Sequence, residues 1–235
     1  MAAALEARYR QFHAEGRLPI RLARKASAPL LLDPHERWLR AEVKLLVVGQ
    51  ETLRWHAGEI RTFHDFSGST EGVATMRELY RQYRLGRDNP KLNSAFWRGF
   101  RTLDGAVNRA VKPASDSALW TNIFKVNVSG SVMTNCTRAE IARIHRAQAG
   151  LLRHEIEVLK PDVVVFFTGP RYDCAIRTEF DGVEFRPFGK APVSTLAILR
   201  APGLPAKTLR SYHPEYLQRS RQFHQISAIA RWAKR

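Results

Sequence analysis

The chain has 235 residues, and 44% of them are hydrophobic, which is enough for a domain with a sizeable core. Lys and Arg number 38 against 22 Asp and Glu, so the net charge is +16 and the pI is near 10.6. A pI this high favours a polyanionic partner, most often nucleic acid, and most of the cations are Arg, which suits phosphate contacts. The alternative is a basic surface without such a partner.

Several classes of protein are excluded by what the sequence lacks. No apolar run approaches the roughly 18–20 residues needed to cross a bilayer, and the first residues lack the apolar core of a signal peptide. We therefore expect a cytoplasmic monomer that does not enter membranes. Two cysteines, Cys136 and Cys174, cannot form a four-thiolate metal site or an iron–sulfur cluster by themselves. We expect free thiols, no metal and no cofactor.

The first 40 residues predict a helix followed by a connecting segment. Leu5, Tyr9 and Phe12 recur at helical spacing within residues 2–15. Residues 17–33 are basic and contain proline, so we expect them to lie on the surface as a connection.

Residues 44–48 form an unbroken apolar run that ends at Gly49, which is typical of a buried parallel strand. Gln50 and Glu51 follow at once. Ligands of open α/β sheets bind beyond the carboxyl ends of the strands, so Glu51 is a candidate for chemistry. The alternative is a surface glutamate in an ordinary turn.

The next segments predict a loop, two helices and a strand. Aromatic and histidine side chains in residues 52–72 suggest a pocket wall, or a loop pinned to the core. Residues 74–85 and 94–111 have aromatic stripes at helical spacing, which we assign to the core. A strand over residues 118–124 carries Asn122, which either pairs with a base edge or bonds nearby backbone. The loop's aromatic and histidine residues are Trp55, His56, Phe63, His64 and Phe66.

The second half repeats the order of helix and strand. Thr137 and Glu140 form a capping box that opens a long helix over residues 137–159. A strand over 162–167 ends at Gly169, where exposed backbone amides and Arg171 could hold a phosphate. Short strands are expected at 183–186 and 195–199, a last sheet strand at 208–211, and a final helix from 220. We find no repeat and no linker, so residues 1–235 are expected to form one domain.

These motifs, in this order, resemble those of the uracil-DNA glycosylase superfamily. Gly49-Gln50-Glu51 is similar to its water-activating loop, and Leu119-Trp120-Thr121-Asn122 to the strand whose Asn reads the base. Phe66-Ser67 is similar to the segment with a base-stacking Phe. Phe167-Thr168-Gly169 falls where a phosphate-contacting turn would be. His213-Pro214, with Leu217 four residues after the His, resembles the second catalytic loop and its wedge.

The resemblance implies a three-layer α/β/α sandwich with a short central parallel sheet, and a monofunctional DNA glycosylase. In that reading the nucleotide is flipped out of the helix, and water cleaves its N-glycosidic bond. Glu51 orients the water, and a neutral His213 donates a hydrogen bond to the departing base. Gln50, Phe66 and Asn122 bind the base. The residues left to contact DNA are Ser67, Gly169, Arg171, Leu217 and Arg219, with Leu217 as an apolar wedge.

The chain departs from the family pattern at both loops. The uracil-specific members that it resembles have Asp at the place of Glu51, then Pro and a Tyr that crowds the 5-position of the base, where this chain has Thr52 and Leu53. The second loop has Glu215 and Tyr216 where Ser and Pro are expected. We therefore expect either uracil or, favoured by Leu53, a bulkier pyrimidine such as 5-hydroxymethyl or glucosylated cytosine of phage DNA.

Two other functions stay open on the sequence alone. One is a non-catalytic nucleic-acid-binding module that keeps the fold and has lost the chemistry, which the altered residues after Glu51 and His213 favour. The other is a nucleotide-handling hydrolase, against which stands the lack of a Gly-rich phosphate loop. A glycosylase would serve either DNA repair or defence against modified invading DNA.

Overall fold

The computed structural model describes residues 1–53, 55–85, 93–108, 117–128, 130 and 132–235. Its centre is a six-stranded sheet in the order β2-β1-β3-β6-β5-β4. The first four of these strands pair in parallel, β5 pairs antiparallel with β6, and β4 pairs antiparallel with β5. The strands are β1 (Leu45–Gly49), β2 (Leu119–Asn122), β3 (Val163–Phe167), β4 (Glu184–Pro187), β5 (Leu196–Arg200) and β6 (Lys207–Ser211).

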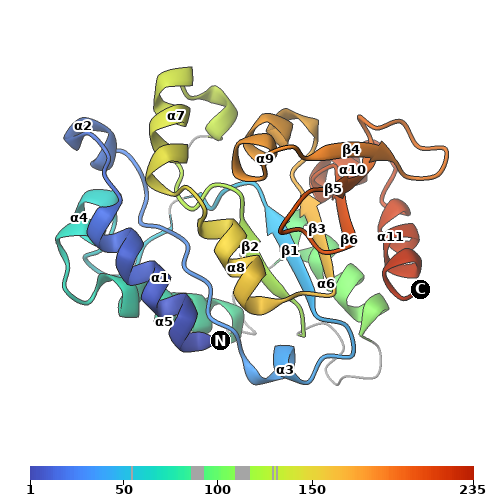
Figure 1. Cartoon of the computed structure of the whole chain (residues 1–235), viewed down its shortest axis with the longest axis horizontal. Coiled ribbons are helices and arrows are strands. Elements are labelled where there is room, and N and C mark those ends of the chain that lie inside the picture. Colours follow the sequence, from blue (N-terminus) through green and yellow to red (C-terminus); the bar gives the residue numbers. More distant parts are fainter. Residues whose placement is uncertain (54, 86–92, 109–116, 129, 131) are drawn as a thin grey trace.

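Helices flank this sheet on both sides. In Figure 1, α8 lies in front of the sheet and α6 behind it, and α11 packs along α6. The chain is thus an α/β protein with a mostly parallel sheet between helical layers. The helices are α1 (Ala2–Glu15), α2 (Ile20–Ala23), α3 (Glu36–Leu39), α4 (Phe63–Gly68), α5 (Gly72–Leu85), α6 (Ala95–Val107), α7 (Arg138–Ala147), α8 (Leu151–Leu159), α9 (Asp173–Glu179), α10 (Pro214–Arg219) and α11 (Gln225–Ala233), with 3-10 turns η2 (Met133–Asn135) and η3 (Pro170–Tyr172).

The predicted strands are present with their ends moved by a few residues. β1 and β3 are buried along their whole length, as continuous apolar runs between two helical layers should be. Gly49 and Asn122 are partners in the parallel register of β1 and β2, so their carboxyl ends are level. The loops after these strands therefore leave the sheet side by side.

Four parts of the secondary-structure prediction are wrong, and one of them is the loop expected over residues 52–72, where residues 63–68 form α4. The segment 17–33 is not a surface connection, because its second half is buried and pairs with the backbone near Lys125 and Asn127. The long helix over 137–159 is two helices, divided where Gly150 adopts φ = 73°. Its capping box at Thr137 is confirmed. Residues 214–219, expected as a loop, form α10, and the end predicted for the 94–111 helix lies outside the described residues.

A buried polar cluster fastens the N-terminal helix to the sheet. Tyr9 of α1 donates to one oxygen of Glu155 on α8, at 2.7 Å, and Lys125 and Thr121 donate to the other at 2.6 and 2.8 Å. Tyr9, Lys125 and Glu155 are fully buried. The ammonium and carboxylate neutralise each other, and the hydroxyls satisfy the remaining lone pairs, as a buried ion pair requires.

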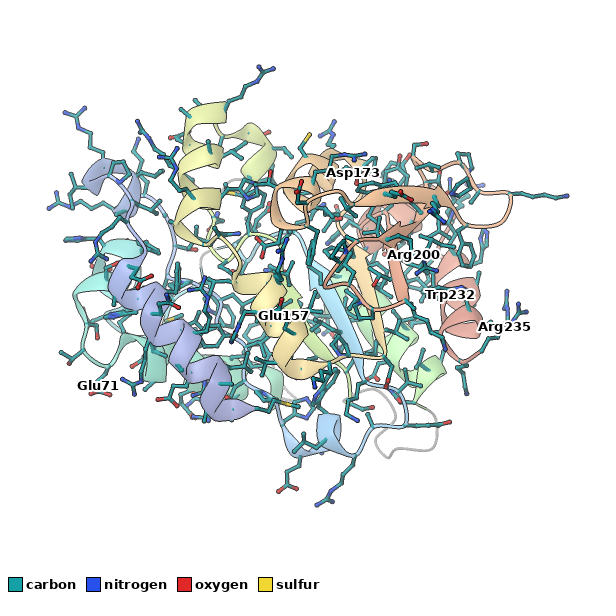
Figure 2. All side chains as sticks on the ribbon, in the orientation of Figure 1. Glu71, Glu157, Asp173, Arg200, Trp232 and Arg235 are labelled. Atoms are coloured by element: carbon teal, nitrogen blue, oxygen red, sulfur yellow. The ribbon has the colours of Figure 1, made fainter. Side chains whose placement is uncertain are left out.

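Side chains fill the space between the layers (Figure 2). Asp173, labelled there on α9, accepts two hydrogen bonds from the buried Arg210 of β6, at 2.9 and 3.0 Å. Both cysteines are free, as predicted. Among the described residues, no helix has the length and apolar character to span a bilayer, and no set of His, Cys, Asp and Glu side chains is grouped to hold a metal ion.

Candidate functional site

A cavity of about 800 Å³ lies at the carboxyl ends of the parallel strands. Residues far apart in the sequence line it: Gln50 and Glu51 after β1, Asn122 at the end of β2, and His213 after β6. Four of the site residues predicted from the sequence therefore share one cavity. Its volume is within the range of pockets that hold small organic ligands.

Two hydrogen-bond donors fix the carboxylate of Glu51. The Tyr172 hydroxyl lies 2.9 and 2.8 Å from the two carboxylate oxygens, and the Met133 amide donates at 3.2 Å. Burial raises the pKa of Glu51 above its ordinary value, and these hydrogen bonds offset part of the effect. Burial and the adjacent carboxylate raise the pKa of Tyr172, so the phenol keeps its proton and stays a donor. Glu51 retains free lone pairs for a water in the cavity.

The backbone around Glu51 is fixed by both neighbouring strands. On one side, Ile123 and Phe124 donate their amides to the carbonyls of Gly49 and Gln50, each at 3.0 Å. On the other side, the Gln50 side chain donates to the Thr168 carbonyl at 2.8 Å. The loop thus leaves the sheet in one defined direction.

His213 is the N-cap of α10, and its Nδ1 accepts from the Glu215 amide at 3.3 Å. The neutral ring then carries its proton on Nε2. Burial lowers the pKa of His213, although the Glu215 carboxylate counteracts this. The neutral form therefore predominates at pH 7, and Nε2–H is the donor that His213 can offer a ligand.

Phe96, from the first turn of α6, stacks on the imidazole with centroids 5.8 Å apart and planes 21° apart. It lines the cavity, although its helical spacing had placed it in the core stripe. The spacing could not identify it, since Phe96 and Phe100 belong to the same i, i+4 face. Only the position of the helix start, beside the strand ends, brings Phe96 to the site.

Asn122 lines the cavity, and the oxygen of its side-chain amide already accepts a hydrogen bond within the protein. Its Oδ1 accepts from the indole nitrogen of Trp120 at 3.1 Å, and its Nδ2 has no hydrogen-bond partner among the described residues. Asn122 is 1% exposed, so the unpaired Nδ2 is costly unless a ligand or water accepts from it. A Cβ at Gly49 would lie 2.4 Å from the Oδ1, so only glycine fits there.

Other predicted site residues lie elsewhere, and two predictions are wrong. Phe66 is fully buried in α4 against Phe12 and His13, so it cannot stack on a ligand in the cavity. Leu217 is fully buried on the inner face of α10, so it is not an exposed wedge. Both errors have one cause: a segment expected as a loop is a helix that turns the side chain inward.

The predicted phosphate turn is also wrong in part. Gly169 is buried, and its amide donates to the Ser211 carbonyl at 2.9 Å, so it has no exposed amide to offer. Arg171 is exposed, as is Arg219, whose guanidinium lies 5.8 Å from the Tyr216 ring. Ser67 bonds the Phe63 carbonyl at 2.9 Å and lines a different hollow, near α1.

No protein-family model matches this chain, and no curated protein matches it significantly.

The remaining wall of the cavity is aromatic. Trp55 belongs to the loop for which the sequence left open a pocket wall or a segment pinned to the core. It lines the cavity and packs edge-on against Tyr83 and Trp120 at 5.2 and 5.8 Å between centroids. Leu53 lines the same cavity and is 58% exposed. The arrangement joins a carboxylate, a neutral imidazole and a free amide donor to flat apolar surfaces. It suits an uncharged planar ligand with hydrogen-bond acceptors, next to a carboxylate that can orient a water.

Proposed function

We propose that the chain is a distant member of the uracil-DNA glycosylase superfamily, with its three-layer fold, and acts in the cytoplasm as a monomeric, monofunctional DNA glycosylase. It would take a flipped pyrimidine into the cavity and hydrolyse the N-glycosidic bond, which leaves an abasic site. The observation that carries the proposal is that Glu51 and His213 line one cavity with Asn122.

The chemistry follows from the state of each group. Cleavage passes through an oxocarbenium-like state, with positive charge on the sugar and negative charge on the leaving base. An ionised Glu51 orients the attacking water and stabilises the cation. Neutral His213 donates from Nε2 to the base oxygen as negative charge develops there, and Asn122 donates from Nδ2 to an acceptor of the base. No lysine is among the described residues that line the cavity, which supports water as the nucleophile.

Glu51→Gln and His213→Ala test the proposal against a non-catalytic DNA-binding module. Wild-type protein should release free base from oligonucleotides that contain uracil or 5-substituted pyrimidines, and each variant should lower the rate by at least 100-fold. Both variants should still bind the oligonucleotides. If the wild type binds DNA and releases no base from any of them, the chain is a binding module.

Thermal unfolding of Glu51→Gln provides the control for folding. Because burial raises the pKa of Glu51, the folded state disfavours its charge, and a neutral amide relieves that cost. We expect a melting temperature equal to or above that of the wild type. A lost activity together with a lowered melting temperature would mean that Glu51 is structural.

A further inference from the structure

Three buried polar atoms in the cavity wall have no hydrogen-bond partner in the part of the chain that the structure describes. Of the eight buried side-chain atoms in this state among the described residues, three belong to residues that line the cavity: Nδ2 of Asn122, Oγ1 of Thr52 and Nε1 of Trp55. Thr52 is 8% and Trp55 is 5% exposed. Buried polar groups are almost always paired, so this concentration indicates a ligand that pairs them.

A pyrimidine ring alone does not account for all three atoms. In the proposed reaction, Asn122 and His213 address the polar atoms of the ring, and Thr52 and Trp55 are left over. A hydroxyl can both donate and accept, and an indole N–H donates. Together they match a further hydroxyl group, not a methyl or a hydrogen.

The position of Trp55 relative to Asn122 is defined by ring contacts, and Thr52 lines the same cavity. Trp55 packs against Trp120 at 5.8 Å, and Trp120 donates to Asn122 at 3.1 Å. Trp120 therefore connects Trp55 to Asn122, the residue proposed to read the base. Tyr83 contacts both Trp55, at 5.2 Å, and Trp120, at 6.0 Å between centroids. Trp55 and Tyr83 thus form one aromatic wall of the cavity, joined to Asn122 through Trp120.

We propose that Thr52, Trp55 and Tyr83 form a subsite for a hydroxylated substituent on the base, such as a hydroxymethyl group or a sugar attached to it. The proposal rests on the glycosylase function and specifies its substrate class. The flat faces of Trp55 and Tyr83 cover the carbon skeleton of the substituent, and Thr52 Oγ1 and Trp55 Nε1 bond its hydroxyls. Leu53 lines the same cavity and is exposed, so this part of the cavity is open to solvent and has room for a substituent.

Thr52→Val removes a hydroxyl with almost no change of shape, and Trp55→Phe removes the indole N–H together with part of the ring, a loss of volume that the Trp232→Phe control shares. We would measure release of free base, as kcat/KM, from two matched pairs of oligonucleotides: uracil against 5-hydroxymethyluracil, and 5-hydroxymethylcytosine against its glucosylated form. The same oligonucleotides would be titrated by fluorescence anisotropy in a Glu51→Gln background. Trp232→Phe and Thr178→Val are matched controls, because Trp232 on α11 (Figure 2) and Thr178 on α9 do not line the cavity.

The wild type should prefer the more hydroxylated member of at least one pair, and each cavity variant should reduce that preference about tenfold, the size of one lost hydrogen bond. The controls should keep it. Release of uracil without any preference for a substituent would overturn the subsite and leave the glycosylase intact. If no base is released, anisotropy still decides: a preference that Trp55→Phe and Thr52→Val abolish supports the subsite, and equal affinities refute it.

Discussion

Tyr172 is buried behind Glu51, and its hydroxyl contacts both oxygens of the carboxylate. It does not line the cavity, so its effect on the reaction must pass through Glu51. The hydrogen bond lowers the pKa of Glu51 against the raising effect of burial. Tyr172 is therefore a positioning residue that also helps Glu51 to stay ionised.

Tyr172→Phe removes only that hydroxyl. The pKa of Glu51 should rise further, and since the proposed reaction uses the ionised form, the acid limb of the rate profile should move to higher pH. We expect a lower kcat at pH 7 with a nearly unchanged KM. A pH profile of base release, with the Glu carboxyl resonances followed by ¹³C NMR, measures both effects. A profile identical to that of the wild type would mean that Tyr172 only fills space.

Glu215 acts on His213 in two ways. Its backbone amide donates a hydrogen bond to Nδ1. Its carboxylate raises the pKa of the imidazole, against the lowering effect of burial. Glu215→Gln keeps the backbone hydrogen bond and removes the side-chain charge, so the pKa of His213 should fall further. The imidazole should then stay neutral to lower pH, which ¹H NMR titration of its ring protons would detect; a pKa that rises would contradict this account.

Among elements, α1 depends on the buried cluster around Glu155. Tyr9→Phe removes one donor to a buried carboxylate and should cost about 1.5–3 kcal/mol of unfolding free energy. Glu155→Gln leaves Lys125 buried without its counter-charge and should cost more, about 3–5 kcal/mol. Urea denaturation measures both. Arg40→Ala, which removes an exposed pair with Glu36, is the control and should change little.

Whether a site residue could be predicted from the sequence depended on the element that carries it. Glu51, Asn122 and His213 could be located from the sequence because each lies at or just after the end of a predicted strand, and parallel strands deliver their carboxyl ends to one edge of the sheet. Phe66 and Leu217 could not, since the inward turn of α4 and α10 depends on packing against α1 and α6. The break before α8 had a local cause in Gly150, but helical periodicity continued on both sides and concealed it.

On the scale of the whole molecule, if DNA is the partner, some of the Lys and Arg side chains that give the net charge of +16 should contact phosphates near the cavity. A second hollow of about 400 Å³ shares Arg98 and Gln218 with the cavity, and Arg101 and Phe223 also line it. Arg98 donates to Gln218 at 2.7 Å, which ties α6 to α10 between the two hollows. We expect the strand next to the flipped nucleotide to pass here.

Arg101→Ala should weaken binding of an oligonucleotide duplex, and it should reduce the slope of log affinity against log salt by about 0.9, the value for one phosphate contact. Arg40→Ala is the matched control. Arg40 follows α3, which lies below the sheet in Figure 1 and precedes the amino end of β1. Equal slopes for the two variants would place the DNA path elsewhere.

α6 approaches the start of α10 so closely that a Cβ at Gly99 would lie 2.6 Å from the Pro214 ring, while Phe96 of the same helix covers His213. The position of the imidazole therefore depends on α6 as well as on α10. Under the proposed function, a bulky substitution at Gly99, or a DNA strand bound on the outer surface of α6, should shift His213, the proposed hydrogen-bond donor to the leaving base. DNA binding and bond cleavage would then be coupled through the close helix approach that Gly99 allows.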